Sequence, residues 1–252
     1  MQESSIWQYR YFLKDSVRKT VDFSRTAQSL GVPPPPIEKP YSPSAERIDL
    51  IPPDEFQRLP SVDLLFAIRN RQSRRRFIDA PLTLDELSFL LWATQGIQQQ
   101  LGAGHALRTV PSAGARHALE TYLCALNVKG LDRGLYRYLP LEHQLLVEYR
   151  DERAAQKIVL AAFKQNWMSS AATIFIWSAI PYRMEWRYGL AAHKVILLDA
   201  GHVCQNLYLA CEATNAGTCA VAAYDQELVD QLLKIDGKDE FAIYLAAVGK
   251  VN

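Results

Sequence analysis

The sequence has almost no net charge and no long uninterrupted apolar run. Its 28 Lys and Arg residues nearly balance 27 Asp and Glu residues, and the formal net charge of +1 argues against a chain that binds nucleic acid or membranes through its overall charge. Residues 1–13 are charged and lack an apolar core, so we predict no signal peptide. Residues 165–182 are uncharged, but Asn and Ser interrupt them, which favours a buried strand over a membrane span.

Cysteine is also scarce, with four residues and no C-x-x-C pair. Cys204 and Cys211 are seven positions apart, so they share one face if that stretch is helical. This spacing favours small core residues over metal ligands. We therefore predict no metal site, and a reducing cytoplasm is the expected compartment.

The common cofactor and hydrolase motifs are missing. Gly102-Ala103-Gly104 lacks the third glycine and the preceding strand of a dinucleotide fingerprint. The sequence contains no phosphate-loop lysine motif, no H-E-x-x-H and no Ser-His-Asp signature. Any cofactor must therefore be bound by a less common set of residues.

Prolines divide the chain into two parts. Residues 1–60 begin with several aromatic side chains and continue through the stiff run Pro33–Pro36, which indicates an N-terminal proline-rich arm. A disordered tail would rarely contain these aromatics, so we expect the arm to pack on another surface. We predict that residues 61–252 form the main domain.

Helical and strand patterns are mixed without regular alternation, which predicts an α+β fold. Ser61 is a possible cap for a helix with Leu64, Leu65 and Ile68 on one face, and Thr83 with Glu86 forms a capping box for the next helix. Gly217 is placed to end the long helix predicted at 194–216. The other predicted helices are 151–163 and 225–234, and the predicted strands are 120–128, 135–138, 144–149, 171–180 (central) and 241–248.

Four arginines and a hydroxyl group lie within Arg71–Phe77. In an extended segment Arg71, Ser73 and Arg75 would point to one side, where planar guanidinium groups suit a phosphate. A solvated basic patch or an RNA contact is the alternative for this segment.

A turn of small residues, Pro111–Gly114, lies further along the chain. Small side chains would let a planar ring approach the backbone N–H groups, and Ser112 can cap the following turn. An ordinary loop between a strand and a helix would have a similar sequence.

Three ordered motifs carry a family resemblance: R-x-S-x-R-x-F at 71–77, L-x-x-L-L-W-A-x-x-G-I at 87–97 and R-T-V-P-S-A-G-A-R-H-x-L-E at 108–120. They resemble the nitroreductase-fold flavoproteins, and in particular the SagB-type dehydrogenases, whose members oxidise azolines to azoles in peptide natural products. The similarity continues at 134–138, 200–209 and 248–250. It implies a nitroreductase-like fold, a central, mainly antiparallel or mixed sheet flanked by helices, and a homodimer whose subunits share each FMN site.

The resemblance also implies roles for individual residues. A phosphate and ribityl site would comprise Arg71, Gln72, Ser73 and Arg75, with Lys250 as a second cationic contact. The loop along the pyrimidine side of the flavin would comprise Pro111, Ser112, Ala113, Gly114 and Ala115. Ala222 and Ala223 would pass the redox-active nitrogen of the ring.

The sequence departs from the azoline-oxidising members at one pair. They have Lys-Tyr before the long helix, with the lysine as the proposed base, and this chain has Arg187-Tyr188. Arginine stays protonated and cannot act as that base, but it can stabilise a developing anion. Tyr188 could relay a proton or could be a structural tyrosine.

Three functions are consistent with this sequence. The first is a dehydrogenase of a small-molecule or peptide-derived heterocycle, with no nucleic-acid or membrane partner. The second is an NAD(P)H-dependent reductase of nitro or quinone compounds. The third is a non-catalytic flavin-binding scaffold protein.

Overall fold

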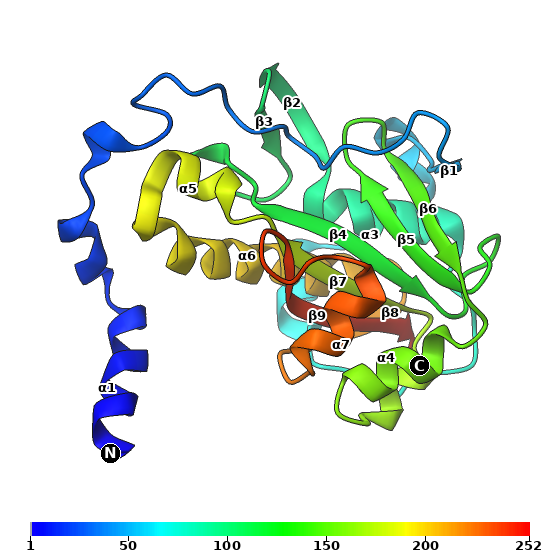
Figure 1. Cartoon of the computed structure of the whole chain (residues 1–252). Coiled ribbons are helices and arrows are strands. Elements are labelled where there is room, and N and C mark those ends of the chain that lie inside the picture. Colours follow the sequence, from blue (N-terminus) through cyan, green and yellow to red (C-terminus); the bar gives the residue numbers. More distant parts are fainter. Residues whose placement is uncertain (1) are drawn as a thin grey trace.

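The computed structural model describes residues 2–252, and the side chains of residues 6–252. A seven-stranded sheet with the order β1-β6-β5-β4-β7-β9-β8 runs through the domain, and all neighbouring strands are antiparallel. The chain therefore has the predicted α+β architecture (Figure 1). The strands are β1 (Arg47–Asp49), β4 (Leu119–Ala125), β5 (Gly134–Leu139), β6 (Gln144–Arg150), β7 (Thr173–Ala179), β8 (Ala216–Val221) and β9 (Phe241–Lys250).

The strand β7 confirms the prediction of a buried central strand. All seven of its residues are buried, and it pairs with β4 on one side and β9 on the other. Apolar side chains on both faces of such a strand need cover on both sides of the sheet. The helices α3 (Leu84–Gln95) and α6 (Ala192–Ala213) contribute to one hydrophobic core, and α4 (Ala154–Ala161) and α7 (Gln226–Leu233) contribute to another.

Local signals placed several helix starts correctly. The predicted capping box is present, since the Glu86 backbone N–H donates to Thr83 Oγ1 at 3.2 Å and the Thr83 N–H donates to Glu86 at 2.9 Å. The predicted cap of α2 (Leu64–Asn70) was wrong, because Asp63, not Ser61, caps the helix. The predicted face with Leu64, Leu65 and Ile68 is exposed, and the helix buries only Ala67.

The predicted end of the long helix was also wrong. The helix α6 ends at Ala213, and Asn215 adopts the left-handed conformation (φ +48°) that we expected at Gly217. Asn tolerates this conformation because its short polar side chain can form local hydrogen bonds. Gly217 lies in β8, where a Cβ atom would be 2.5 Å from the side chain of Arg74. The glycine therefore allows close approach of another segment.

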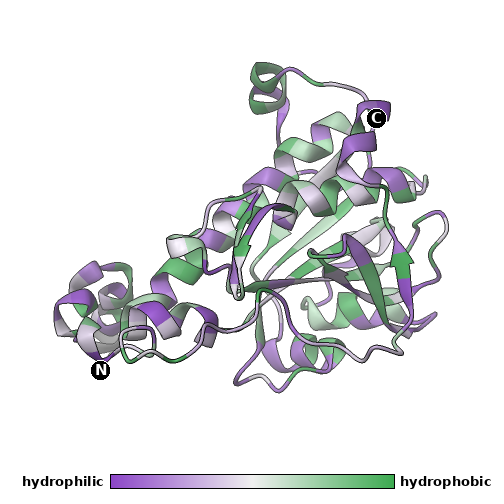
Figure 2. Cartoon of the chain, turned by 90° about the horizontal axis from the view of Figure 1, so that it is seen from above, coloured by the Kyte–Doolittle hydropathy of each residue, from purple (hydrophilic) through white to green (hydrophobic). Residues whose placement is uncertain are grey.

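The first 60 residues consist of distinct parts. The helix α1 (Gln2–Leu13) lies apart from the body of the domain in both views (Figures 1 and 2). Residues 26–40, which we call the strap, cross the domain, and Arg108 Nη2 binds the Ile37 carbonyl oxygen at 2.7 Å. The strand β1 then pairs with β6. Much of the proline-rich arm is thus integrated into the fold.

The remaining elements are a hairpin, a short helix and 3-10 turns. The hairpin of β2 (Ile97–Gly102) and β3 (His105–Arg108) stands beside the strap, and α5 (Tyr182–Tyr188) precedes α6. No helix in residues 2–252 has the length and apolar character needed to cross a bilayer. The 3-10 helices are η1 (Asp15–Thr20), η2 (Phe23–Arg25), η3 (Pro53–Arg58), η4 (Ala113–Ala115), η5 (Asn166–Ser170) and η6 (Gly189–Ala191).

Candidate active site

The arginine segment, Arg71–Phe77, runs along the edge strand β8. The Arg74 N–H donates to the Thr218 carbonyl oxygen at 2.9 Å, and Ser73 forms a parallel bridge with Thr218. Because β8 is the last strand of the sheet, its outer edge is free to pair with this segment. The backbone of the segment is therefore fixed to the sheet.

Tyr208 of α6 orients two side chains of this segment. Its hydroxyl lies 2.9 Å from Ser73 Oγ and accepts a hydrogen bond from the Ala220 N–H at 2.9 Å. The Arg71 guanidinium stands 5.2 Å from the centre of the Tyr208 ring, a cation–π contact. Arg71 and Ser73 thus meet on one tyrosine, as alternation predicts, while the Arg74 side chain packs against Gly217.

The arginines of this segment have no acidic partner among the side chains of residues 6–252. In that range, no carboxylate lies within 4.0 Å of the charged nitrogens of Arg71, Arg74, Arg75 or Arg76. Arg74–Arg76 line a cavity of about 510 Å³ together with Ser73 and the last two residues of the chain. Gln72 is exposed. Guanidinium groups without acidic partners around a cavity are candidates to bind an anion.

Lys250 is placed differently. Its ammonium group forms an ion pair with Glu86 and donates to the Thr214 carbonyl oxygen at 2.7 Å. The side chain is 16% exposed. The structure therefore does not bring this charge together with the arginine segment.

The loop predicted to meet the ring has a left-handed backbone. Gly114 (φ +59°), Ala115 (φ +51°) and His117 (φ +45°) all have positive φ angles. Such conformations cost energy in residues other than glycine and persist only where surrounding contacts hold them. One such contact is the hydrogen bond from the His117 N–H to Ser112 Oγ at 2.9 Å.

The structure places the Arg187-Tyr188 pair directly against this loop. A Cβ atom on Gly114 would lie 2.6 Å from the Tyr188 hydroxyl and 2.8 Å from Arg187 Nε. A glycine at position 114 suits both the left-handed backbone and the close approach of these two side chains. The 111–115 loop and the Arg187-Tyr188 pair, two predicted parts of the site that are more than 70 positions apart in the sequence, are therefore neighbours in the fold.

Asp199 is a site residue that our sequence analysis missed. It lies on α6, is 5% exposed, and accepts a hydrogen bond from the Ala113 N–H at 3.4 Å through Oδ1. Its Oδ2 atom is buried and has no hydrogen-bond partner among the described residues. Burial raises the pKa of this carboxyl group. An acidic residue following the apolar run Val195–Leu198 was the sequence signal for it.

The two halves of the site contact opposite flanks of α6. The arginine segment meets the helix at Tyr208, and the 111–115 loop meets it at Asp199. Nine residues of α-helix correspond to about 13 Å and about two and a half turns. Tyr208 and Asp199 therefore project in opposite directions. Ala222 and Ala223, both exposed, follow β8 and so belong to the half that contains the arginines.

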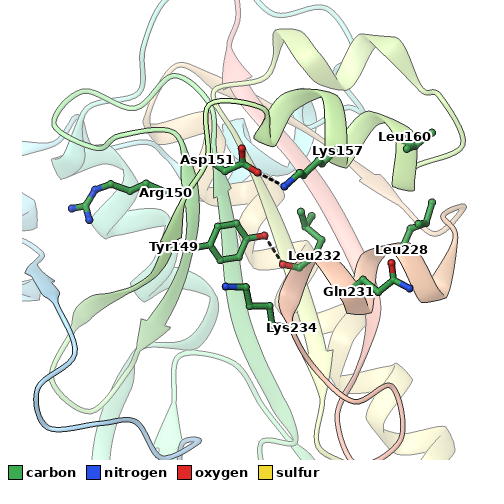
Figure 3. A pocket seen from close by; sticks show the side chains of 9 residues that line it. All are labelled: Tyr149, Arg150, Asp151, Lys157, Leu160, Leu228, Gln231, Leu232 and Lys234. Atoms are coloured by element: carbon green, nitrogen blue, oxygen red, sulfur yellow. Dashed lines mark hydrogen bonds and ion pairs between the residues drawn. The ribbon is translucent and has the colours of Figure 1, made fainter.

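A separate cavity of about 500 Å³ lies between β6, α4 and α7 (Figure 3). Its polar groups bind each other: Lys157 pairs with Asp151 at 2.5 Å, and the Tyr149 hydroxyl donates to the Leu232 carbonyl oxygen at 2.6 Å. None of the site residues predicted from the sequence lines this cavity.

Comparison with known proteins identifies the family. The model of the Nitroreductase family matches residues 68–250, a range that includes the arginine segment, the 111–115 loop and the Arg187-Tyr188 pair. This chain belongs to the nitroreductase family. A nitroreductase-like protein of Methanocaldococcus jannaschii is 35% identical over 180 residues, which cover 71% of this chain and 87% of the relative.

Solved structures have the same fold. A nitroreductase-like protein of Anabaena variabilis (TM-score 0.68, 24% identity) is matched over 83% of this chain, which spans 42% of the Anabaena chain. A chain of the Escherichia coli microcin synthetase McbBCD complex, solved with truncated pro-MccB17 bound, has a TM-score of 0.61 and 19% identity over 81% of this chain and 84% of its own. A family structure from Desulfovibrio desulfuricans in complex with FMN has a TM-score of 0.53 and 17% identity, over 75% and 86%.

Proposed function

We propose that this nitroreductase-family oxidoreductase depends on FMN and is a SagB-type dehydrogenase of a small-molecule or peptide-derived heterocycle. The observation that carries the FMN assignment is the cluster of arginines alongside β8 that have no acidic partner among the described side chains. Arg71 and Ser73 of this segment contact Tyr208, and Arg74–Arg76 line the adjoining cavity. A phosphomonoester with a charge of about −1.5 to −2 suits such a cluster. The FMN-bound relative from Desulfovibrio desulfuricans supports the same choice of cofactor.

The residues of the two halves would have distinct tasks. Arg71, Ser73 and Arg75 would bind the phosphate, with the polar side chain of Gln72 beside them. The small residues of the 111–115 loop would let the planar ring approach the backbone, as would Ala222 and Ala223. Lys250 would assist only if its ammonium group moved away from Glu86.

The Arg187-Tyr188 pair would act on the substrate. Bound flavin supplies the hydride chemistry, and the protein supplies anchoring, orientation and exclusion of water. Tyr188 would donate or relay a proton through its hydroxyl, and Arg187 would stabilise negative charge that develops on the substrate. Their contact with Gly114 places both groups at the predicted ring-binding loop.

We also propose that two copies share each flavin. The arginine segment and the loop lie on opposite flanks of α6, so one chain does not bring them to a common ligand. An exposed apolar surface adjoins the arginine segment: Leu64, Leu65, Phe66 and Ile68 of α2 are each more than half exposed. A patch of this kind on a soluble domain is typical of an interface. A homodimer would cover it and complete the site.

The decisive measurement is the absorption spectrum of the full-length protein after incubation with excess FMN and removal of free flavin. We expect a retained yellow chromophore at one flavin per chain. A colourless protein would overturn the proposal. Reduction of the bound flavin by an azoline-bearing peptide without NAD(P)H would support the dehydrogenase assignment.

A nitro or quinone reductase driven by NAD(P)H is the second candidate, and the 35% identity to a relative named as a nitroreductase favours it. Bleaching of the flavin by NAD(P)H would support this activity, and a flavin that stays oxidised would exclude it. A flavin-binding scaffold protein is the third candidate, supported by Arg187 in place of the lysine and by the relative found in a synthetase complex. Turnover with any electron donor would exclude it. The four cysteines are free and buried, in keeping with a cytoplasmic location.

A further inference from the structure

Trp186 connects the N-terminal strap to the Arg187-Tyr188 pair. It precedes the pair on α5 and is 7% exposed. Its carbonyl oxygen accepts a hydrogen bond from the Gln28 N–H at 2.9 Å, and its indole N–H donates to the Val32 carbonyl oxygen at 2.9 Å. Both partners belong to the strap. One residue thus attaches α5 to this segment through its backbone and through its side chain.

Arg116 and the β2–β3 hairpin close a ring of contacts around the pair. The Arg116 guanidinium stands 5.0 Å from the centre of the Trp186 ring and also donates to the Gly104 carbonyl oxygen. Gly104 lies at the tip of the hairpin, where a Cβ atom would be 2.5 Å from the Pro35 carbonyl oxygen of the strap. The ring therefore runs from the strap through α5, the 111–117 segment and the hairpin, and back to the strap.

The far end of the strap is fixed to buried charges of the sheet. Arg108 Nη2 binds the Ile37 carbonyl oxygen at 2.7 Å, and the Lys39 N–H donates to Glu120 at 2.8 Å. Arg108 and Glu120 are both buried. The strap is therefore held at this end by Arg108 of β3 and Glu120 of β4, and Arg183 of α5 binds the same Glu120 oxygen at 2.5 Å.

We infer that Trp186 is a positioning residue, through which the strap holds Arg187 and Tyr188 against Gly114. This inference rests on the proposed function, in which the pair acts on a ligand beside the flavin. The helix α5 has seven residues and ends at Gly189 (φ +51°), so its orientation depends on tertiary contacts. A displacement of about 1 Å at such a pair can cost a hundredfold in rate.

The test uses full-length protein loaded with FMN and benzoate as a carboxylate probe for Arg187, followed by the change in flavin absorbance. The Trp186→Phe substitution keeps a ring beneath Arg116 but removes the donor to Val32. We expect benzoate affinity to fall by about 2- to 10-fold, the equivalent of one net hydrogen bond, with FMN affinity within about twofold of the unchanged protein. Trp92→Phe is the matched control, because Trp92 packs against Phe56 away from the strap. It should change neither affinity.

Further results distinguish a failure of the positioning role of Trp186 from a failure of the proposed function. Unchanged benzoate affinity in Trp186→Phe, with a loss in Arg187→Ala, would overturn the positioning role and leave the proposed function standing. Unchanged affinity in Arg187→Ala would remove Arg187 from the site, and the inference would fall with it. If Trp186→Phe does not fold, the same benzoate titration is made with Gln28→Pro. This substitution removes the N–H that binds the Trp186 carbonyl oxygen and leaves the sequence of α5 unchanged. A purely structural role predicts a lower Tm and no change in benzoate affinity well below that temperature.

Discussion

Two groups of arginines in this protein have opposite surroundings. One comprises Arg71, Arg74, Arg75 and Arg76 on the edge of the sheet, and the other comprises Arg137 and Arg183 in the interior. Arg183 pairs with Glu120 at 2.5 Å, Arg137 pairs with Glu148 at 3.1 Å, and both side chains are 2% exposed. The edge group has no acidic partner in the described part of the chain. Arginine content alone therefore does not indicate a ligand site, and a cluster of neighbouring arginines without acidic partners is the stronger reason to propose one.

The largest expected effect is on the buried group. Glu120 binds Arg183 and the Lys39 N–H and lies 3.6 Å from Arg137. Glu120→Gln would leave the buried Arg183 guanidinium without its anion and would remove one of the two anions near Arg137, so we expect a loss of about 3–5 kcal/mol in the free energy of unfolding. Urea denaturation of the apoprotein measures this loss. Glu46→Gln is the control, because its ion pair with Arg150 is exposed and screened by solvent, and we expect a much smaller loss of stability. Equal losses of stability in the two variants would contradict the difference that we expect between buried and exposed ion pairs.

The second largest expected effect is a loss of protein stability in acid, through the ion pairs of the buried group. Burial alone would raise the pKa of Glu120, but Arg183 and Arg137 outweigh burial and hold that pKa below its ordinary value of 4.5. A carboxyl group whose pKa is lowered by folding contributes stability that is present above its unfolded pKa and lost as the pH falls towards its folded pKa. We expect the free energy of unfolding to fall below about pH 4.5 with a slope of up to about 1.4 kcal/mol per pH unit for each such group. Urea denaturation across this range should show a smaller slope for Glu120→Gln, and an identical slope would assign the acid sensitivity to other carboxyl groups.

The edge group should affect flavin binding instead of stability. Arg71→Ala would remove one charge-assisted contact, and we expect FMN affinity to fall by the equivalent of about 1.5–3 kcal/mol. Titration of the apoprotein, followed by quenching of flavin fluorescence, measures this affinity. Arg76→Ala is a control of equal charge change outside the predicted alternation, and we expect a smaller loss. If both variants bind FMN as tightly as the unchanged protein, the phosphate assignment is wrong.

The parts of this structure that were predictable from the sequence depend on interactions between residues close together in the chain. The capping box at Thr83 and the buried strand β7 follow from side chains within a few residues of each other, and both were predicted correctly. The partners of the buried arginines were not predictable, because Glu120 is 63 positions from Arg183. The integration of the strap and the pairing of β1 with β6 depend on contacts of the same long range.

In the candidate site, too, local sequence patterns did not predict the contacts between distant residues. Alternation in the arginine segment brought Arg71 and Ser73 to one side, but Tyr208, on which they meet, lies more than 130 positions away. The side chain of Lys250 has the right charge for phosphate, yet it pairs with Glu86 of α3, which is 164 positions away in the sequence. A local pattern can therefore show which side chains share a face, but not which charges are already neutralised.

Salt offers the smallest and most selective test of the two groups. Exposed charges are screened by added salt, and buried ion pairs are screened much less. We expect FMN affinity to fall by about 2- to 5-fold between about 0.05 and 0.5 M NaCl, because the edge arginines line an open cavity. The free energy of unfolding of the apoprotein should change little over the same range, since the interior pairs are nearly inaccessible. Arg71→Ala should reduce the salt dependence of FMN binding, because one screened contact is gone. An FMN affinity that does not depend on salt concentration, together with a free energy of unfolding that does, would contradict the assignment of ligand binding to the edge group and of stability to the interior group.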